Sequence, residues 1–143
     1  MESILVSACL LGANCKYSGG SNLCPEVVAL KEIYHLVPVC PEQLGGLSTP
    51  REPAEQRGGL VLTRSGADVT AQFRRGAEEA LRLANLLGCR KAVLKSRSPS
   101  CGAGPIYDGS FTGTLVPGRG IAAKLLLENG IAVFTEDSLP GKT

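Results

Sequence analysis

The chain has 143 residues, which is typical of one domain, and a formal net charge of only +2 from 15 Lys and Arg against 13 Asp and Glu. A chain of this length buries roughly 68–70% of the surface that its unfolded form would expose, enough for a self-supporting core. It has three Tyr, three Phe, no Trp and no basic run longer than two residues. Because nucleic-acid-binding surfaces combine basic patches with stacking aromatic side chains, we expect a single domain over 1–143 that binds no nucleic acid.

The N-terminal segment and the apolar pattern indicate a cytoplasmic protein. The opening MESILVSAC lacks the basic region, long apolar core and small-residue cleavage site of a secretory signal. No apolar run approaches the roughly 18 residues needed to cross a bilayer, so we expect no membrane partner. Thiols stay reduced in the cytoplasm. The six cysteines therefore favour a metal, a cluster or catalysis over disulfides.

The first predicted element is a short buried strand over 4–7, followed by a glycine-containing loop. A proline at the first turn opens a predicted helix over 25–34, whose apolar residues recur at helical spacing. HLVPV (35–39) predicts a second strand. Its Pro38 cannot donate a ladder hydrogen bond, which either weakens this prediction or places the strand at an edge of the sheet. The stretch 40–59 predicts a long loop, and long ordered loops are often functional.

The second half of the chain starts with a predicted hairpin over 60–70, turning at Ser65-Gly66. The clearest helix covers 71–88, where apolar residues share one face and Gly88 caps the C-terminus. The remaining predicted elements are, in chain order, a strand over 91–94, a helix over 120–130, a strand over 131–134 and a tail over 135–143 that we expect to fray.

This alternation of strands and helices predicts an α/β fold. We expect a mostly parallel sheet of four to five strands with helices on both faces and a small hairpin insertion. The sequence shows neither an internal repeat nor a linker.

The predicted topology separates the cysteines into two groups. Cys9 follows the first strand by two residues, Cys40 directly follows the second, and Cys101 lies in the loop after the third. Ligand sites in such sheets lie outside the carboxyl ends of the strands, so we expect these three thiols to converge at one edge. Cys89 precedes the third strand and is expected at the opposite edge as a small buried side chain.

Two further cysteines lie close to the expected site. Cys15 belongs to the first loop, and Cys24 precedes a helix whose N-terminus faces the same edge. A helix N-terminus lowers the pKa of a thiol, so either could be a ligand, a redox partner or a bystander. Cys15 is the stronger candidate for an additional site cysteine. The single histidine, His35, is expected to be structural.

The cysteine pattern also restricts the metal. No CxxC pair is present, which argues against zinc ribbons and fingers. Thiolates without imidazole suit zinc or an iron–sulfur cluster. A [4Fe–4S] cluster normally takes four cysteines, so three would leave one iron open, and open coordination is typical of catalytic metal sites. A chance grouping of reduced thiols is the alternative.

Polar residues near these cysteines complete the candidate site. Glu42 lies in the segment CPE, where a carboxylate can act as acid, base or ligand. The hydroxyls of Ser98 and Ser100 could orient a substrate or cap backbone amides in an ordinary turn. Gly102 would let the backbone approach a ligand closely, so we expect Ser100 and Gly102 to contact the substrate. Arg51 could bind an anionic group, although surface arginines are common.

The chain resembles the DUF523 family, whose characterised members are thiouracil desulfidases. The resemblance runs from Ser7 to about Glu136. It rests on five segments: SACLLGANCKYSGG, VPVCPEQLGGLSTPREPAE, GADVTAQFRRGA, LKSRSPSCGAGPIYDGSFTG and GRGIAAKLL. The SPSCG and CPE…GG…TPR motifs are specific in combination.

The resemblance implies a [4Fe–4S] cluster held by Cys9, Cys40 and Cys101, the same three thiols that the topology brings together. It also implies that Glu42 and Ser98 are catalytic. In the expected reaction, an open iron acts as a Lewis acid on the thiocarbonyl sulfur of a small thiolated pyrimidine such as 2-thiouracil. Glu42 activates a water and Ser98 holds the heterocycle. We expect a monomer or a weak homodimer.

Three other functions compete with this hypothesis. A non-catalytic iron–sulfur protein, sulfur carrier or sensor would hold the cluster but would not need Glu42. A sulfur transferase acting on tRNA would need a basic surface or another domain, which the near-neutral charge argues against. A structural zinc protein would use the thiols without an open position.

Overall fold

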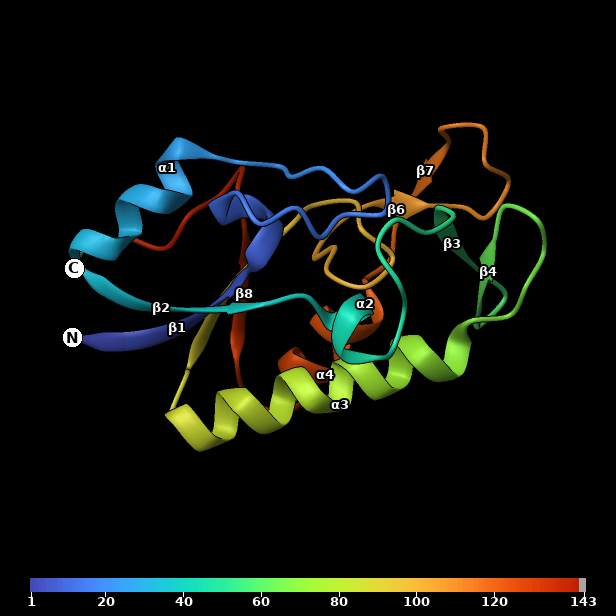
Figure 1. Ribbon diagram of the computed structural model, residues 1–143. Coiled ribbons are helices and arrows are strands. Elements are labelled where there is room, and N and C mark those ends of the chain that lie inside the picture. The colour runs from blue at the N-terminus through green and yellow to red at the C-terminus, as the bar shows by residue number, and fades with distance from the viewer. Residues whose placement is uncertain (142–143) are drawn as a thin grey trace.

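The computed structural model describes residues 1–141 and contains a four-stranded parallel sheet (Figure 1). The strands are β1 (Glu2–Ser7), β2 (Tyr34–Val39), β5 (Lys91–Leu94) and β8 (Ala132–Thr135). Their order is β2-β1-β5-β8, and every neighbouring pair is parallel. The predicted α/β fold with a mostly parallel sheet is confirmed. Among the described residues, no helix combines the length and the apolar character that a bilayer crossing requires.

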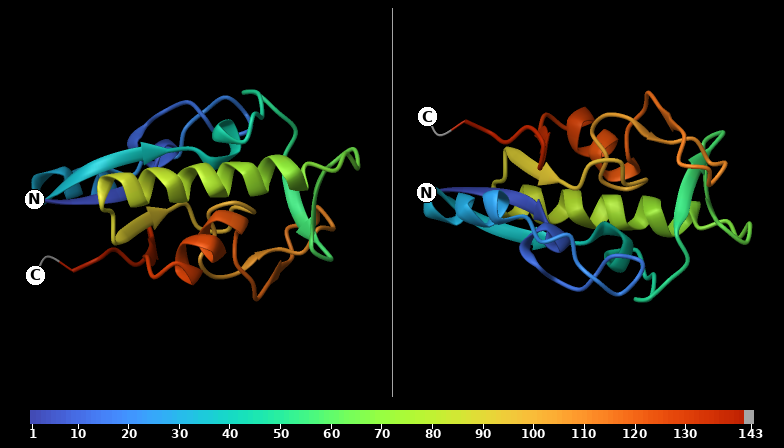
Figure 2. Two further views of the ribbon diagram at one scale, coloured as in Figure 1. Left: turned by 90° about the horizontal axis from the view of Figure 1, so that it is seen from below. Right: turned by 90° about the horizontal axis from the view of Figure 1, so that it is seen from above.

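Helices cover both faces of the sheet, as predicted. On one face lie α3 (Thr70–Leu87) and α4 (Ile121–Glu128), which pack side by side (Figure 2). The other face is covered by the short helix α1 (Pro25–Val28) and by 3₁₀ turns over 8–11 and 29–32. Because both faces are buried, the central strands carry nearly continuous apolar runs instead of a polar alternation.

Alternate side chains of each strand enter the two layers of the core. Leu5 and Leu94 pack against Ala80 of α3 and Leu126 of α4. On the opposite face, Ile4, Val6 and Val93 of the strands form a second cluster. They pack with Val27 of α1 and with Leu10 and Leu30 of the two 3₁₀ turns. The alanines of α3 and α4 bring these helices close to the sheet, which fixes the position of the loops at its carboxyl end.

The edge position of β2 explains its proline. Pro38 lies opposite Val6 of β1, and the other side of β2 has no neighbour within the described sheet. A proline without an N–H is tolerated at such an edge, as the sequence suggested. The helix predicted over 25–34 is shorter than expected. It changes to a 3₁₀ turn at Ala29 and ends before Tyr34, because Tyr34 already pairs with Glu2 of β1.

The stretch predicted as a loop over 40–59 contains α2 (Pro41–Leu44) and β3 (Ala54–Arg57). β3 pairs with β4 (Leu60–Thr63) in a hairpin that was not predicted and that turns at Gly58-Gly59. Both of these glycines have positive φ angles, 56° and 82°, as a two-residue hairpin turn requires. The turn predicted at Ser65-Gly66 is also present: beyond it Asp68 forms an isolated antiparallel bridge with Leu62, and the Val69 N–H donates to the Val61 carbonyl at 2.9 Å.

Two features at the C-terminal side differ from expectation. A second hairpin joins β6 (Ile106–Tyr107) to β7 (Leu115–Val116) and was not predicted. The tail predicted to fray is ordered as far as Gly141, because Leu139 packs on the core and the Tyr34 hydroxyl donates to the Gly141 carbonyl at 3.2 Å. The last two residues of that predicted tail, 142–143, lie outside the described residues.

Two glycines allow α2 to lie directly on α3 (Figure 1). A Cβ atom at Gly45 would collide with the backbone carbonyl of Gln72, and one at Gly76 would collide with that of Pro41. Since neither backbone can move without disturbing its helix, this contact determines the position of α2. It thereby also determines the position of Glu42, which α2 carries.

We predict that Gly76→Ala destabilises the fold although the residue is helical. At a helix position with free space the same change would stabilise by about 1 kcal/mol. Here the added methyl group meets the Pro41 carbonyl, so we expect the free energy of unfolding to fall by about 1–3 kcal/mol in urea denaturation. The control is Gly104→Ala, whose Cβ would have no atom within 4 Å. If Gly76→Ala is as stable as the wild type, the α2–α3 contact does not have this role.

Candidate active site at the carboxyl ends of the strands

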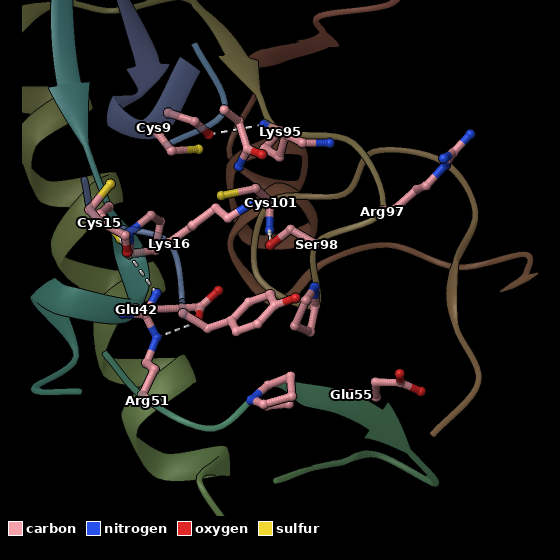
Figure 3. Close-up of a pocket in the computed structure, with 18 of the residues that line it drawn as sticks. Cys9, Cys15, Lys16, Glu42, Arg51, Glu55, Lys95, Arg97, Ser98 and Cys101 are labelled. Atoms are coloured by element: carbon pink, nitrogen blue, oxygen red, sulfur yellow. Dashed lines mark hydrogen bonds and ion pairs between the residues drawn. The ribbon is translucent and has the colours of Figure 1, made fainter. Parts of the chain in front are cut away.

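A cavity of about 430 Å³ lies at the carboxyl ends of β1, β2 and β5 (Figure 3). This volume is in the range of small-molecule sites. Four cysteines line it: Cys9, Cys15, Cys40 and Cys101. The cavity is therefore lined by thiols from three separate segments of the chain, at the edge where the topology predicted them.

Each of the three predicted ligand cysteines follows a different strand. Cys9 lies in the 3₁₀ turn directly after β1, Cys40 precedes the first turn of α2, and Cys101 lies in the loop after β5. Figure 3 shows the sulfurs of Cys9 and Cys101 directed into the same space. The fourth thiol, Cys15, is buried in the first loop, and its carbonyl accepts a hydrogen bond from the Cys40 thiol at 3.8 Å.

The donor set fits an iron–sulfur cluster. The cavity presents four thiols and no imidazole, a combination that suits such clusters. Within residues 1–141, no three His, Cys, Asp or Glu side chains are spaced to hold one metal ion. In a cubane cluster each cysteine binds a different iron, so the thiolates stand farther apart than the ligands of one ion.

Burial raises the pKa of three of the thiols that line the cavity. Burial, with the nearby Cys40 thiol, raises the pKa of Cys15 to about 12. Burial likewise raises the pKa of Cys101 to about 12 and raises that of Cys9, despite a hydrogen bond from Asn22. Without a metal these thiols stay protonated at neutral pH. Metal binding would release the protons and stabilise the thiolates.

Glu42 is held at the cavity by Arg51. Its Oε1 accepts a hydrogen bond from Arg51 Nε at 3.0 Å, and the two side chains are only 18% and 8% exposed. The carboxylate faces the interior of the cavity (Figure 3). Arg51, which the sequence suggested for an anionic group, thus binds a carboxylate of the chain itself.

The loop that carries Cys101 is held by its own turn and by α4. Ser98 Oγ accepts hydrogen bonds from the N–H groups of Ser100 and Cys101, at 3.1 and 3.0 Å, which is ordinary turn chemistry. Ser98 also lines the cavity, and its hydroxyl hydrogen is left to donate to a ligand. The first N–H groups of α4 donate to loop carbonyls: Ile121 to Pro99 at 2.9 Å and Ala122 to Ser100 at 2.8 Å.

Ser100 and Gly102 do not line the cavity. The Ser100 side chain is fully buried behind the cavity wall. A Cβ at Gly102 would lie 2.8 Å from the Ser98 carbonyl and 3.0 Å from Ile106, so the glycine serves close packing inside the loop. In the structure both residues shape the loop from within, and the substrate contact expected for them stays a prediction.

The remaining residues singled out from the sequence lie outside the cavity. The Cys24 thiol donates to Glu26 Oε2 at 3.2 Å. Cys89 is buried in the core at the start of β5, the end of the sheet opposite to the cavity, as predicted. His35 is exposed on β2 and does not line the cavity.

The sequence did not reveal the aromatic wall of the cavity. Tyr17, Tyr107 and Phe111 line it, the last two from the second hairpin. Glu55 Oε1 on β3 accepts the N–H groups of Gly109 at 3.0 Å and Phe111 at 3.2 Å, which holds this hairpin beside the cavity. The two-residue strands of the hairpin give no periodic pattern, so no local signal was available.

A second ion pair attaches the Cys101 loop to the C-terminal segment. Lys95 Nζ lies 2.8 Å from Glu136 Oε2, and Ser96 donates to the same carboxylate through its N–H at 2.8 Å and its hydroxyl at 3.0 Å. Burial alone would raise the pKa of Glu136. The hydrogen bonds from Lys95 and Ser96 outweigh it, so the pKa is lower than usual.

Comparisons with known proteins agree with this geometry. The sequence model of the 2-thiouracil desulfurase family matches residues 4–138. An uncharacterized protein of Bacillus subtilis strain 168, YbbK, is 41% identical over 146 residues, covering 95% of this chain and 97% of its own. The family match thus makes the chain an α/β protein of a sulfur-handling class.

A known structure is similar over nearly the whole chain. The [4Fe-4S]-dependent thiouracil desulfidase TudS (DUF523) is 50% identical and superposes with a TM-score of 0.92, covering 98% of this chain and 94% of its own. The chain belongs to the 2-thiouracil desulfurase family, and the resemblance to DUF523 is confirmed.

We predict that Glu136→Gln lowers stability in a pH-dependent way. A carboxyl whose folded pKa is depressed contributes stability above its unfolded pKa, near the ordinary 4.5, and loses it as the pH falls. At pH 7 we expect a loss of about 1–2 kcal/mol in urea denaturation of the cluster-free protein. The difference from wild type should shrink below about pH 4.5.

The matched control for this prediction is Glu128→Gln. Glu128 is exposed at the end of α4 and has no ion pair within residues 1–141, so its loss should change little at either pH. A loss for Glu136→Gln that is equal at pH 7 and pH 3 would contradict the prediction.

Proposed function

We propose that this chain is a desulfidase that removes sulfur, as hydrosulfide, from thiolated nucleobases such as 2-thiouracil. The observation that carries the proposal is a single cavity of about 430 Å³ that joins four thiols to the Glu42 carboxylate and the Ser98 hydroxyl. The family and the [4Fe-4S]-dependent structural relative support the same function.

Cys9, Cys40 and Cys101 are the residues proposed to hold a [4Fe–4S] cluster. They follow three neighbouring strands, and their sulfurs share one buried cavity. When bound through three thiolates, such a cluster supplies an iron free of protein ligands, a Lewis acid toward the thiocarbonyl sulfur. Cys15, the fourth thiol in the cavity, is proposed to remain unligated.

Glu42 is the proposed base. Its carboxylate takes a proton from a water molecule, which then attacks the carbon of the C–S bond. The water oxygen becomes the carbonyl oxygen of uracil, and the sulfur leaves as hydrosulfide with one of the water protons. Nothing is oxidised or reduced, so the reaction needs no electron donor.

Ser98 and the aromatic wall are proposed to bind the heterocycle. The Ser98 hydroxyl can donate a hydrogen bond to the exocyclic carbonyl oxygen of the heterocycle, because its own oxygen already accepts two backbone N–H groups that fix its position. Tyr17 and Tyr107 give the cavity flat apolar surfaces that suit a planar ring.

The substrate is proposed to be a free small molecule in the cytoplasm, and the enzyme a monomer or weak homodimer. The net charge of +2 supports this proposal over an RNA substrate, which would call for a basic surface. A non-catalytic sulfur carrier is the rival function. A non-catalytic carrier would not need a carboxylate held toward the thiols, as Glu42 is held by Arg51.

The decisive experiment is anaerobic reconstitution with iron and sulfide, followed by an assay with 2-thiouracil. We expect the broad visible absorption of an iron–sulfur cluster, and uracil and hydrosulfide in equal amounts over many turnovers. A protein that binds the cluster but releases no hydrosulfide would be a carrier or sensor. A colourless protein containing zinc would identify a structural zinc site.

A series of cysteine variants tests the ligand assignment. We predict that changing Cys9, Cys40 or Cys101 to Ser strongly reduces iron and sulfide content and abolishes turnover. Cys15→Ser should retain the cluster, and the control Cys24→Ser, outside the cavity, should resemble wild type. If Cys15→Ser loses its iron while one of the other three variants keeps it, then Cys15 is a cluster ligand and that other cysteine is not.

The variant Glu42→Gln tests the role of Glu42 as a base while leaving the proposed cluster ligands unchanged. We predict unchanged iron content and visible absorption, because Glu42 is not a proposed ligand, and a fall in kcat of roughly 1,000-fold, as expected for loss of a general base. Full activity in this variant would remove Glu42 from the mechanism.

A further inference from the structure

Arg51 makes more polar contacts at the cavity than its ion pair with Glu42. The guanidinium is only 8% exposed and donates to acceptors from three segments of the chain. The partners are Glu42 Oε1 at 3.0 Å, the Cys15 carbonyl at 2.9 Å, the Ser48 carbonyl at 3.1 Å and Thr49 Oγ1 at 2.9 Å. The two dashed lines at Arg51 in Figure 3 show the first two of these contacts.

These contacts exploit the planar fork of arginine. Nε, Nη1 and Nη2 point in fixed directions, and each has a different partner. A lysine carries the same charge on one flexible nitrogen and cannot reproduce the set. Among residues 1–141, Glu42 is the one carboxylate within ion-pair distance of Arg51. The position of the Glu42 side chain thus depends on Arg51 in particular.

The pair leaves one carboxylate oxygen available. Oε1 of Glu42 is taken by Arg51, while Oε2 has no hydrogen-bond partner among the described residues. The Glu42 carboxylate faces the space into which Cys9 and Cys101 point (Figure 3). The backbone N–H of Arg51 also donates to the Tyr17 carbonyl at 2.8 Å, which links the segment carrying Arg51 to the first loop.

We propose that Arg51 is a positioning residue that acts through Glu42: it holds Oε1 and so presents Oε2 to the attacking water. The inference rests on the proposed desulfidase function. The proposal assigns Arg51 no bond to the substrate or to the cluster. Its effect is on the orientation of the base.

The test uses the reconstituted enzyme with 2-thiouracil. Arg51→Lys should lower kcat about 100-fold, the order expected when a reacting group is misplaced by about 1 Å. KM, iron content and visible absorption should stay at wild-type values. The control is Arg82→Lys, an exposed arginine paired with Glu79 at 3.4 Å, which should keep full activity.

A double-variant cycle distinguishes positioning from general structural support. If Arg51 acts through Glu42, the variant carrying Glu42→Gln and Arg51→Lys should be no slower than Glu42→Gln alone. A double variant slowed by the product of the two single effects would overturn the inference. So would Arg51→Lys with wild-type kcat, or with a changed KM and an unchanged kcat.

Thr49→Val is a milder variant that serves if Arg51→Lys does not fold. It removes one acceptor of Nη1 and leaves the ion pair in place. We expect a several-fold fall in kcat at constant KM, and an unchanged kcat would overturn the inference. If the wild-type enzyme is inactive, both the proposed function and this inference are overturned. If the wild type is active and Arg51→Lys is equally active, the inference alone is overturned.

Discussion

Close backbone contacts through glycine determine where the reactive groups of this protein lie. Gly45 and Gly76 let α2 rest on α3, which sets the position of Glu42. Gly120 does the same for the Cys101 loop: a Cβ there would collide with the Ser100 backbone. The N–H groups at the start of α4 then bond to that loop. Both segments are therefore held in place by their contacts with α3 and α4, and not by their own short elements.

A second constraint is electrostatic. The cavity combines thiols of raised pKa with a cation, Arg51, that is already neutralised by Glu42. The partly buried ion pair of Lys95 with Glu136 is likewise balanced. These two pairs hold loops at the cavity, whereas the buried thiols would need a metal centre to become stable thiolates.

Sequence patterns predicted the sheet and the convergence of Cys9, Cys40 and Cys101 because both follow from local properties. Buried apolar runs mark the parallel strands, and the residues after them must meet at one edge. The second hairpin and the aromatic wall could not be predicted, since they are held by a distant carboxylate, Glu55. The full burial of Ser100 could not be predicted either, because it depends on packing with residues distant in the sequence.

The strand register has a consequence for protein engineering. Glu2 pairs with Tyr34, and the Tyr34 hydroxyl bonds to Gly141, so the beginning of the chain and the last described residues meet at the amino ends of the strands. The cavity lies at the other end of the sheet, beyond the carboxyl ends of the strands (Figure 3). A purification tag, a surface anchor or a fused partner attached at this end would therefore leave the mouth of the cavity free.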